Sequence, residues 1–380
     1  MRQFILILIL IILILAIKGF SQEIGFKGQI SSWIVTKPFD DFQSQLGARY
    51  IPELSFGYSF KEKYTLDAEM SVKMYGYAYY NGDSVSWEGN LDLFRGWVRF
   101  STNKFNIRVG LQKINFGSAA MLRPLMWFDR IDPRDPLQLT EGVYSVLGRY
   151  YFANNANIWL WFLYGNDKQK GWELLPSFKD IPEFGGRFQT PLFNGELAVS
   201  YHHRVANMEA FLPPEYQTSS YRVPENRVGL DGKWDVGVGL WFETSFIRQE
   251  IDIPELKSKK LINIGLDYTL GLGSGLMLTG EQLWVTNGEK FFEGNECNTF
   301  TAISANYPIS IIDNLTYIFY YDWSNNGVYN FINWGMTWDK ISLYLMAYWN
   351  PEDYNLYQYL SDEITLYTGK GFHIQFVFNH

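Results

Sequence analysis

The sequence predicts an all-β protein, a transmembrane antiparallel up-and-down β-barrel of about 18 strands (16–18). Three observations predict this fold. Segments of strand length alternate apolar and polar side chains along the whole chain after the first 24 residues. The connections between these segments alternate between tight and long. Aromatic residues make up 18% of the 380 residues, which is typical of barrels that carry two aromatic girdles.

The alternation is clearest in the last segment, where apolar residues at every second position oppose polar ones. The apolar row is Phe372, Ile374, Phe376 and Phe378, and the polar row is His373, Gln375 and Asn379. The predicted strands are 25–37, 45–60, 64–80, 88–101, 104–117, 144–152, 156–166, 182–190, 195–206, 226–234, 237–250, 259–270, 275–286, 298–309, 314–323, 328–338, 341–350 and 363–379.

Every second connection is short, and the intervening ones are mostly long and polar, with 324–327 as the exception. Tight turns on one rim and long loops on the other are typical of outer-membrane barrels. An even number of strands places both termini on the tight-turn, periplasmic side. We find no internal repeat and therefore expect one domain. A soluble, carbohydrate-binding β-protein is the alternative that the aromatic content leaves open.

Residues 1–21 have the three parts of a secretory signal: Arg2, an apolar run over 4–17, and the small residues Gly19 and Ser21. We predict cleavage before Gln22, so that 1–21 is a signal peptide and 22–380 is the barrel. The apolar run is shorter than the ~20 residues of a spanning helix, although an uncleaved anchor is the alternative. The expected location is the outer membrane of a Gram-negative bacterium.

The net charge of −8 and the single cysteine argue against some partners and sites: a nucleic acid and an internal disulfide. An acidic chain is a poor match for a polyanion, so we expect no nucleic-acid partner. Cys297 is the single cysteine and cannot form an internal disulfide, so we interpret it as an incidental loop thiol. We expect no cofactor and no metal site.

The longest connection, 118–143, is not an ordinary polar loop. It combines bulky apolar residues with charged ones, and its three prolines prevent strand pairing. The apolar residues are Met121, Leu122, Leu125, Met126, Trp127 and Phe128. Because these side chains must be buried somewhere, we predict that the segment folds inward and narrows the channel. The alternative is a compact external cap on neighbouring loops.

Inward-facing arginines form the predicted pore site. We assign Phe94, Val98 and Phe100 to the lipid face, which turns Arg95 and Arg99 inward. The same parity turns Arg108 and Arg149 inward. The long connection adds Arg123, Asp129, Arg130, Asp132, Arg134 and Asp135. Such a positive wall beside acids would favour anionic or dipolar solutes. The alternative is that these arginines pair with Asp67, Glu69, Asp129 and neighbouring acids to brace the wall.

The stretch from Arg108 to Gly117, followed by Asp132-Pro133-Arg134-Asp135-Pro136, resembles porin-type barrels of the alginate-export kind. In those proteins an Arg-x-Gly-x-Gln strand ending in an aromatic-Gly pair leads to an Asp-Pro loop. The resemblance covers about 30 residues, with Phe116 where the family would have Trp. It implies an outer-membrane solute channel; it does not imply alginate as the solute.

We therefore expect a channel for passive diffusion of small hydrophilic solutes and not an enzyme. Its expected partners are outer-membrane lipids and lipopolysaccharide, a small solute and the barrel-assembly machinery, with monomer and trimer both open. One alternative is a non-channel protein that aids surface polysaccharide assembly. Another is a barrel enzyme acting through His202, although no nucleophile motif surrounds His202 or His203, and adjacent strand residues point to opposite faces.

Overall fold

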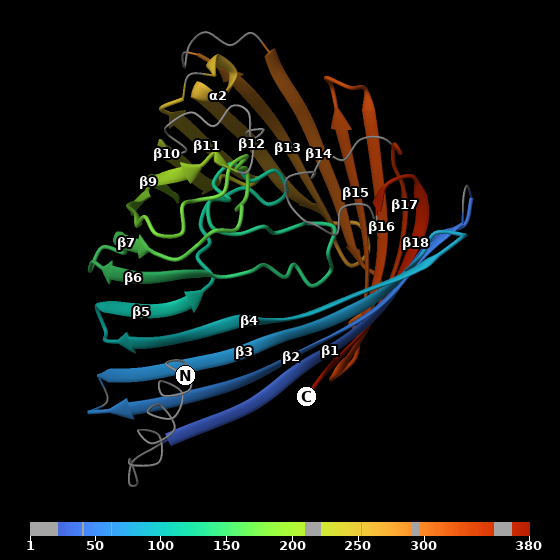
Figure 1. Ribbon diagram of the computed structural model, residues 1–380, viewed down its shortest axis with the longest axis horizontal. Coiled ribbons are helices and arrows are strands. Elements are labelled where there is room, and N and C mark those ends of the chain that lie inside the picture. The colour runs from blue at the N-terminus through green and yellow to red at the C-terminus, as the bar shows by residue number, and fades with distance from the viewer. Residues whose placement is uncertain are drawn as a thin grey trace.

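The computed structural model describes residues 22–39, 42–61, 63–209, 222–251, 253–289, 296–352 and 367–380. Within them, eighteen antiparallel strands form one closed sheet (Figure 1). Each strand pairs with its neighbours in sequence, and β1 also pairs with β18. The predicted signal peptide, 1–21, lies outside the described residues.

The strand bounds are β1 Gln22–Lys37, β2 Gln43–Phe60, β3 Tyr64–Tyr80, β4 Val85–Ser101, β5 Phe105–Gln112, β6 Val143–Tyr151, β7 Asn157–Leu163, β8 Glu183–Leu192, β9 Gly195–Asn207, β10 Arg222–Asp235, β11 Gly239–Gln249, β12 Ser258–Leu270, β13 Leu276–Gly288, β14 Glu296–Pro308, β15 Asp313–Asp322, β16 Gly327–Thr337, β17 Ile341–Trp349 and β18 Lys370–Asn379. A short helix, α2 (Pro254–Lys257), precedes β12. Among the described residues, no helix has the length and apolarity to cross a membrane.

The number, order and closure of the strands confirm the sequence prediction. The alternation of faces is confirmed as well. In β18, Phe372, Ile374 and Phe376 are 40–46% exposed on the outer surface, whereas His373 and Gln375 are 5% and 3% exposed. The outer wall is therefore apolar, which is the surface that a barrel turns to lipid.

One strand ends earlier than predicted, because β5 stops at Gln112 and not at Gly117. The Gln112 amide donates to the carbonyls of Arg108 and Ser145, so it satisfies groups at the end of the ladder. Beyond it, Ile114 is only 1% exposed within an internal apolar cluster. Burial of these side chains inside the barrel takes the chain away from the wall.

The last predicted strand, 363–379, differs too, since β18 begins at Lys370. Residues 363–366 of that prediction lie outside the described residues.

The assignment of Phe94 to the lipid face is wrong. A register shift between β3 and β4 pairs Ser71 with Arg95 but Val72 with Leu93, which leaves Phe94 as an extra residue in β4. The bulge turns Phe94 to the inside, where it lines a cavity together with Asp92. Its ring lies 4.0 Å from the Arg95 guanidinium carbon.

Two connections run inside the barrel rather than outside it. The first inward segment, 113–142, joins β5 to β6, and the second inward segment, 164–182, joins β7 to β8 (Figure 1). The first contributes Met121, Leu122, Met126 and Ile131 to an apolar cluster on the inner wall. The barrel interior is therefore partly filled by packed side chains.

Candidate functional site

Glu281 of β13 holds the first inward segment against the wall. Its carboxylate accepts the backbone N–H groups of Ala120 at 2.6 Å, Met121 at 3.1 Å and Leu122 at 2.5 Å. The indole of Trp241 and the amide of Asn263 donate to the same carboxylate, each at 3.2 Å. Hydrogen bonds to a carboxylate are stronger than neutral ones, so this contact fixes the segment firmly.

A second carboxylate repeats the arrangement on β11. Glu243 is fully buried and accepts the backbone N–H groups of Ala119 at 2.8 Å and Leu125 at 2.5 Å. The Trp127 indole donates to Ser245 Oγ at 2.9 Å from the same segment. Both glutamates lie near the middle of their strands. These contacts with the inner wall contradict the alternative of an external cap.

Two of the predicted pore arginines are held within the first inward segment. Arg123 lies 3.1 Å from Asp129, and Arg134 forms a bidentate ion pair with Asp132 at 2.6–3.0 Å. Both arginine side chains are buried. For Arg123 and Arg134 the structure favours the bracing interpretation over the solute-contact one.

Two wall arginines also have protein partners. Arg95 donates to the carbonyl of Thr140 at 2.7 Å, which ties β4 to the first inward segment. Arg99 donates to Asp67 on β3 at 2.9 Å and 3.0 Å, which is a pair of the alternative, bracing interpretation. Arg99 stays one-third exposed, so it also borders the lumen.

Arg108, Arg130 and Arg149 form no ion pair among the described residues. Arg108 on β5 pairs in register with Arg99 on β4. Arg149 lies on the next strand, β6, where it pairs with Asn106 of β5. Like charges on neighbouring strands repel. Tryptophan faces offset part of this cost, because the guanidinium carbon of Arg108 lies 4.5 Å from the Trp97 ring and that of Arg149 lies 3.7 Å from Trp159.

A cavity of about 630 Å³ opens between the two inward segments and strands β2–β4. Three of the ten predicted site residues line it, namely Asp129, Arg130 and Asp135. Its wall side carries Arg49, Lys73, Tyr75, Tyr77, Glu88 and Asp92. The lining therefore mixes both signs of charge with aromatic rings.

Burial changes the acidity of the segment's carboxyl groups at this cavity. Desolvation raises the pKa of Asp129, against the lowering effect of Arg123, and desolvation also raises the pKa of Asp135. Desolvation acts in the same sense on Glu141, but bonds from Lys168 at 3.0 Å and Lys73 at 3.4 Å outweigh it and lower the Glu141 pKa. The Lys73–Glu141–Lys168 bridge links the wall to both inward segments.

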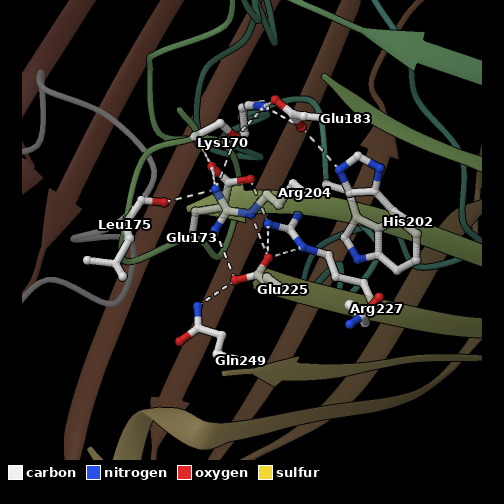
Figure 2. Close-up of polar contacts among 12 residues, drawn as sticks. Lys170, Glu173, Leu175, Glu183, His202, Arg204, Glu225, Arg227 and Gln249 are labelled. Carbon is white, nitrogen blue, oxygen red and sulfur yellow. Dashed lines mark hydrogen bonds and ion pairs between the residues drawn. The ribbon is translucent and has the colours of Figure 1, made fainter. Parts of the chain in front are cut away.

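The second inward segment was not predicted, because 167–181 has the length and charge of an external polar connection. It is held by a buried charged cluster (Figure 2). Its Lys170 lies 2.9 Å from Glu183, and its Glu173 lies 3.3 Å from Arg204 and 2.7 Å from Arg227. The bulky apolar residues Trp172, Leu174, Leu175 and Phe178, close together in this segment, are the signal that could have found it.

The cluster continues into the wall. Arg204 is fully buried, and it donates to Glu225 at 2.6 Å and 3.0 Å and to the carbonyl of Leu175 at 3.0 Å. Glu225 also accepts Arg227 at 2.6 Å and Gln249 at 2.5 Å (Figure 2). Each buried charge therefore has partners of opposite sign, as buried charges require.

His202 belongs to the same interior. It is fully buried, accepts the Trp161 indole at Nδ1 (3.1 Å) and donates from Nε2 to Glu183 (3.1 Å). The adjacent His203 contacts Asn226 instead, at 3.0 Å, and is only partly buried. The two histidines lie on opposite faces, as the strand parity predicted, and that His202 plays no catalytic part stays a prediction.

Sequence comparisons find no matching family model and no matching curated protein. Solved structures share the architecture. Pseudomonas aeruginosa OccK5 (OpdH) has a TM-score of 0.57 at 10% identity, covering 94% of this chain and 97% of that one. Acinetobacter baumannii OccAB1 has 0.56 at 11% identity, covering 96% and 97%. The trimer form of the Vibrio cholerae outer membrane protein OmpT has 0.52 at 11% identity, covering 95% and 100%. This chain therefore has the closed antiparallel barrel fold of outer-membrane porins.

Proposed function

We propose that the chain is an outer-membrane channel for passive diffusion of small hydrophilic solutes, with a preference for anionic or dipolar ones. The observation that carries the proposal is the row of partly exposed arginines, Arg99, Arg108 and Arg149, on adjacent strands of one inner wall. Two of the three have no ion-pair partner among the described residues, so their charge is available to a solute.

The distribution of packing supports a path along this wall. The buried carboxylates and arginine that anchor the inward segments, Glu243, Glu281 and Arg204, lie on β9–β13. On the opposite side, Arg95 and the partly exposed Lys73–Glu141 pair tie the first segment to β4 and β3. The cavity at β2–β4 lies on the other side of the first inward segment. We infer that this segment is the constriction, that solute enters at the cavity beside Arg130, and that it continues past Arg108.

The membrane location rests on the apolar outer wall and on the shared porin fold. Outer-membrane lipids, lipopolysaccharide and the barrel-assembly machinery follow as proposed partners, and export through the 1–21 signal peptide is part of the same proposal. The alginate-export subtype and the choice between monomer and trimer stay predictions.

Planar-bilayer recording tests the channel and its preference together. We expect discrete conductance steps, and a reversal potential in a KCl gradient that indicates preferential chloride flow. A folded, inserted protein that passes no current would contradict the channel and favour the non-channel alternative. A channel with cation preference would contradict the anionic preference alone.

Charge reversal at Arg108 is the residue-level test. We expect Arg108→Glu to shift the reversal potential towards cation preference, and Arg108→Gln to shift it less, because field strength in a narrow pore follows the local charge. The shift should shrink as salt rises, since the screening length is only ~10 Å at 0.1 M. The matched control is Lys340→Glu, which makes the same charge change at an exposed turn. Equal shifts in both variants would contradict a role for Arg108.

A further inference from the structure

The tight-turn rim of the barrel is divided into two chemically different arcs. Four consecutive turns between β8 and β15 carry no charged residue: 193–194, 236–238, 271–275 and 309–312. We call these four turns the apolar arc. The arc contains one amide, Asn194, beside its apolar tips. Of the remaining turns, 152–156 is also uncharged but has Asn154 and Asn155 at its tip, and the others carry charged tips, including Lys61, Lys63, Lys104, Asp339 and Lys340.

The apolar arc presents large side chains outward. Ile311 and Phe193 are 105% and 90% exposed, and Val236 and Leu272 are 63% and 57% exposed. Phe193 has a φ of 54°, a backbone conformation that favours glycine or asparagine. The turn geometry therefore does not call for a phenyl group at this tip. Large apolar side chains exposed on successive turns are typical of contact surfaces.

Aromatic side chains with polar ends indicate the depth of these turns. The Trp234 indole donates to the Leu192 carbonyl at 3.1 Å, beside the first turn of the arc. The Tyr307 hydroxyl lies against the turn at Gly273, where an added Cβ would be 2.2 Å from it. Trp and Tyr place their polar ends at the membrane–water interface. The apolar arc therefore lies at the level of the lipid headgroups.

The arc is also continuous with the outer wall above it. Leu266 of β12 and Ile303 of β14 are 50% and 43% exposed on that wall, and Ile309 at the following turn is 48% exposed. Two aspartates flank these turns, and each accepts a hydrogen bond from its own turn: Asp235 from Gly237 N–H and Asp313 from the Ser310 hydroxyl, both at 3.1 Å. Because exposed apolar side chains continue from the wall to the tips, the lipid that would contact the wall would also contact the arc.

We propose that the apolar arc is a membrane-contact surface, seated in the inner-leaflet headgroup region, so that the barrel tilts with its β8–β15 side deeper than its β2–β7 side. The opposite turns, with charged tips or with the amides of Asn154 and Asn155, stay in water, as the cost of placing charged and polar groups in lipid requires. The partner that contacts the apolar arc is a phospholipid surface. The inference rests on the proposed membrane location.

Site-specific fluorescence quenching tests this inference. Single cysteines are introduced as Phe193→Cys, Ile311→Cys, Asn154→Cys and Leu266→Cys in a Cys297→Ser background, since Cys297 is exposed. Each is labelled with an environment-sensitive fluorophore and folded into phosphatidylcholine vesicles. The vesicles contain lipids that are spin-labelled either at the headgroup or in the acyl chain.

We expect the headgroup quencher to act several times more strongly on the labels at positions 193 and 311 than on the label at 154. Labels at all three turns quenched equally would overturn the tilt while leaving the membrane location intact. An unquenched label at position 266, in both lipid mixtures, would overturn the membrane location itself. A third outcome is that the labels at 193 and 311 are shielded from aqueous iodide but are quenched by neither lipid. This result would show that another protein surface covers the arc, and it would overturn the lipid assignment.

Discussion

Replacing Glu281 by alanine should release the first inward segment and increase the single-channel conductance. The glutamate is 3% exposed and accepts five donors, three of them backbone N–H groups of residues 120–122. Since an unsatisfied buried donor costs about 1–3 kcal/mol, we expect the free energy of unfolding to fall by about 3 kcal/mol or more. The segment, now without its anchor, would leave more of the lumen open to ions.

Conductance in planar bilayers and guanidinium unfolding in lipid vesicles measure the two effects. Glu281→Gln keeps one oxygen acceptor and should give an intermediate result. Glu23→Gln removes the same charge at an exposed position of β1 and is the matched control. Unchanged conductance in a folded Glu281→Ala barrel would show that the first inward segment does not limit the current.

Replacing Arg204 by methionine should produce the largest loss of stability in the chain. The change removes a fully buried cation and leaves Glu173 and Glu225 short of a partner. Breaking a buried ion pair from one side costs about 3–5 kcal/mol, because the remaining charge stays desolvated. Arg204→Lys should restore little, since an ammonium lacks the planar fork that reaches Glu225 with two nitrogens.

The control for this variant is Arg248→Met, at an exposed arginine of β11, where we expect a change of no more than about 0.5 kcal/mol. Proteolysis near residues 164–182 supplies a second measurement, because loss of the Arg204 contacts to Glu173 and the Leu175 carbonyl should expose this segment. Equal stability of the two variants would contradict the anchoring role of the cluster.

The partly filled interior explains why the predicted arginines divide into two groups. Arg123 and Arg134 lie in a packed segment where an unpaired charge would be costly, so each has an aspartate within hydrogen-bonding distance. Arg108 and Arg149 lie on a wall that remains partly exposed, where water can solvate them and tryptophan faces support them. Residues of one type therefore have different roles according to their surroundings.

The confirmed part of the prediction rests on patterns among residues close together in the sequence. A period of two along a segment reports a strand with two unlike faces wherever it occurs, so the eighteen strands and the outward direction of Phe372, Ile374 and Phe376 could be predicted. Six bulky apolar residues within 121–128 likewise require burial whatever surrounds them.

Other features depend on residues far apart in the chain. Glu281 is 161 residues from Ala120, and Glu243 is 124 residues from Ala119, so nothing near either glutamate indicates its partner. The bulge that turns Phe94 inward depends on how β3 and β4 align, which their separate patterns do not show. The second inward segment contains enough charge to be interpreted as a solvated loop, until Arg204 and Arg227 neutralise its glutamate.

The amino-acid sequence by itself therefore determined the closed barrel, its facing rows and the burial of one long connection, because periodicity and apolar content act on the nearest residues. Only the tertiary structure decided where that connection is anchored, that a second one joins it, and which arginines keep an unpaired charge. The physical reason is that a buried charge needs hydrogen-bond donors or an opposite charge beside it, and for Glu281 and Glu173 these come from residues far away in the sequence.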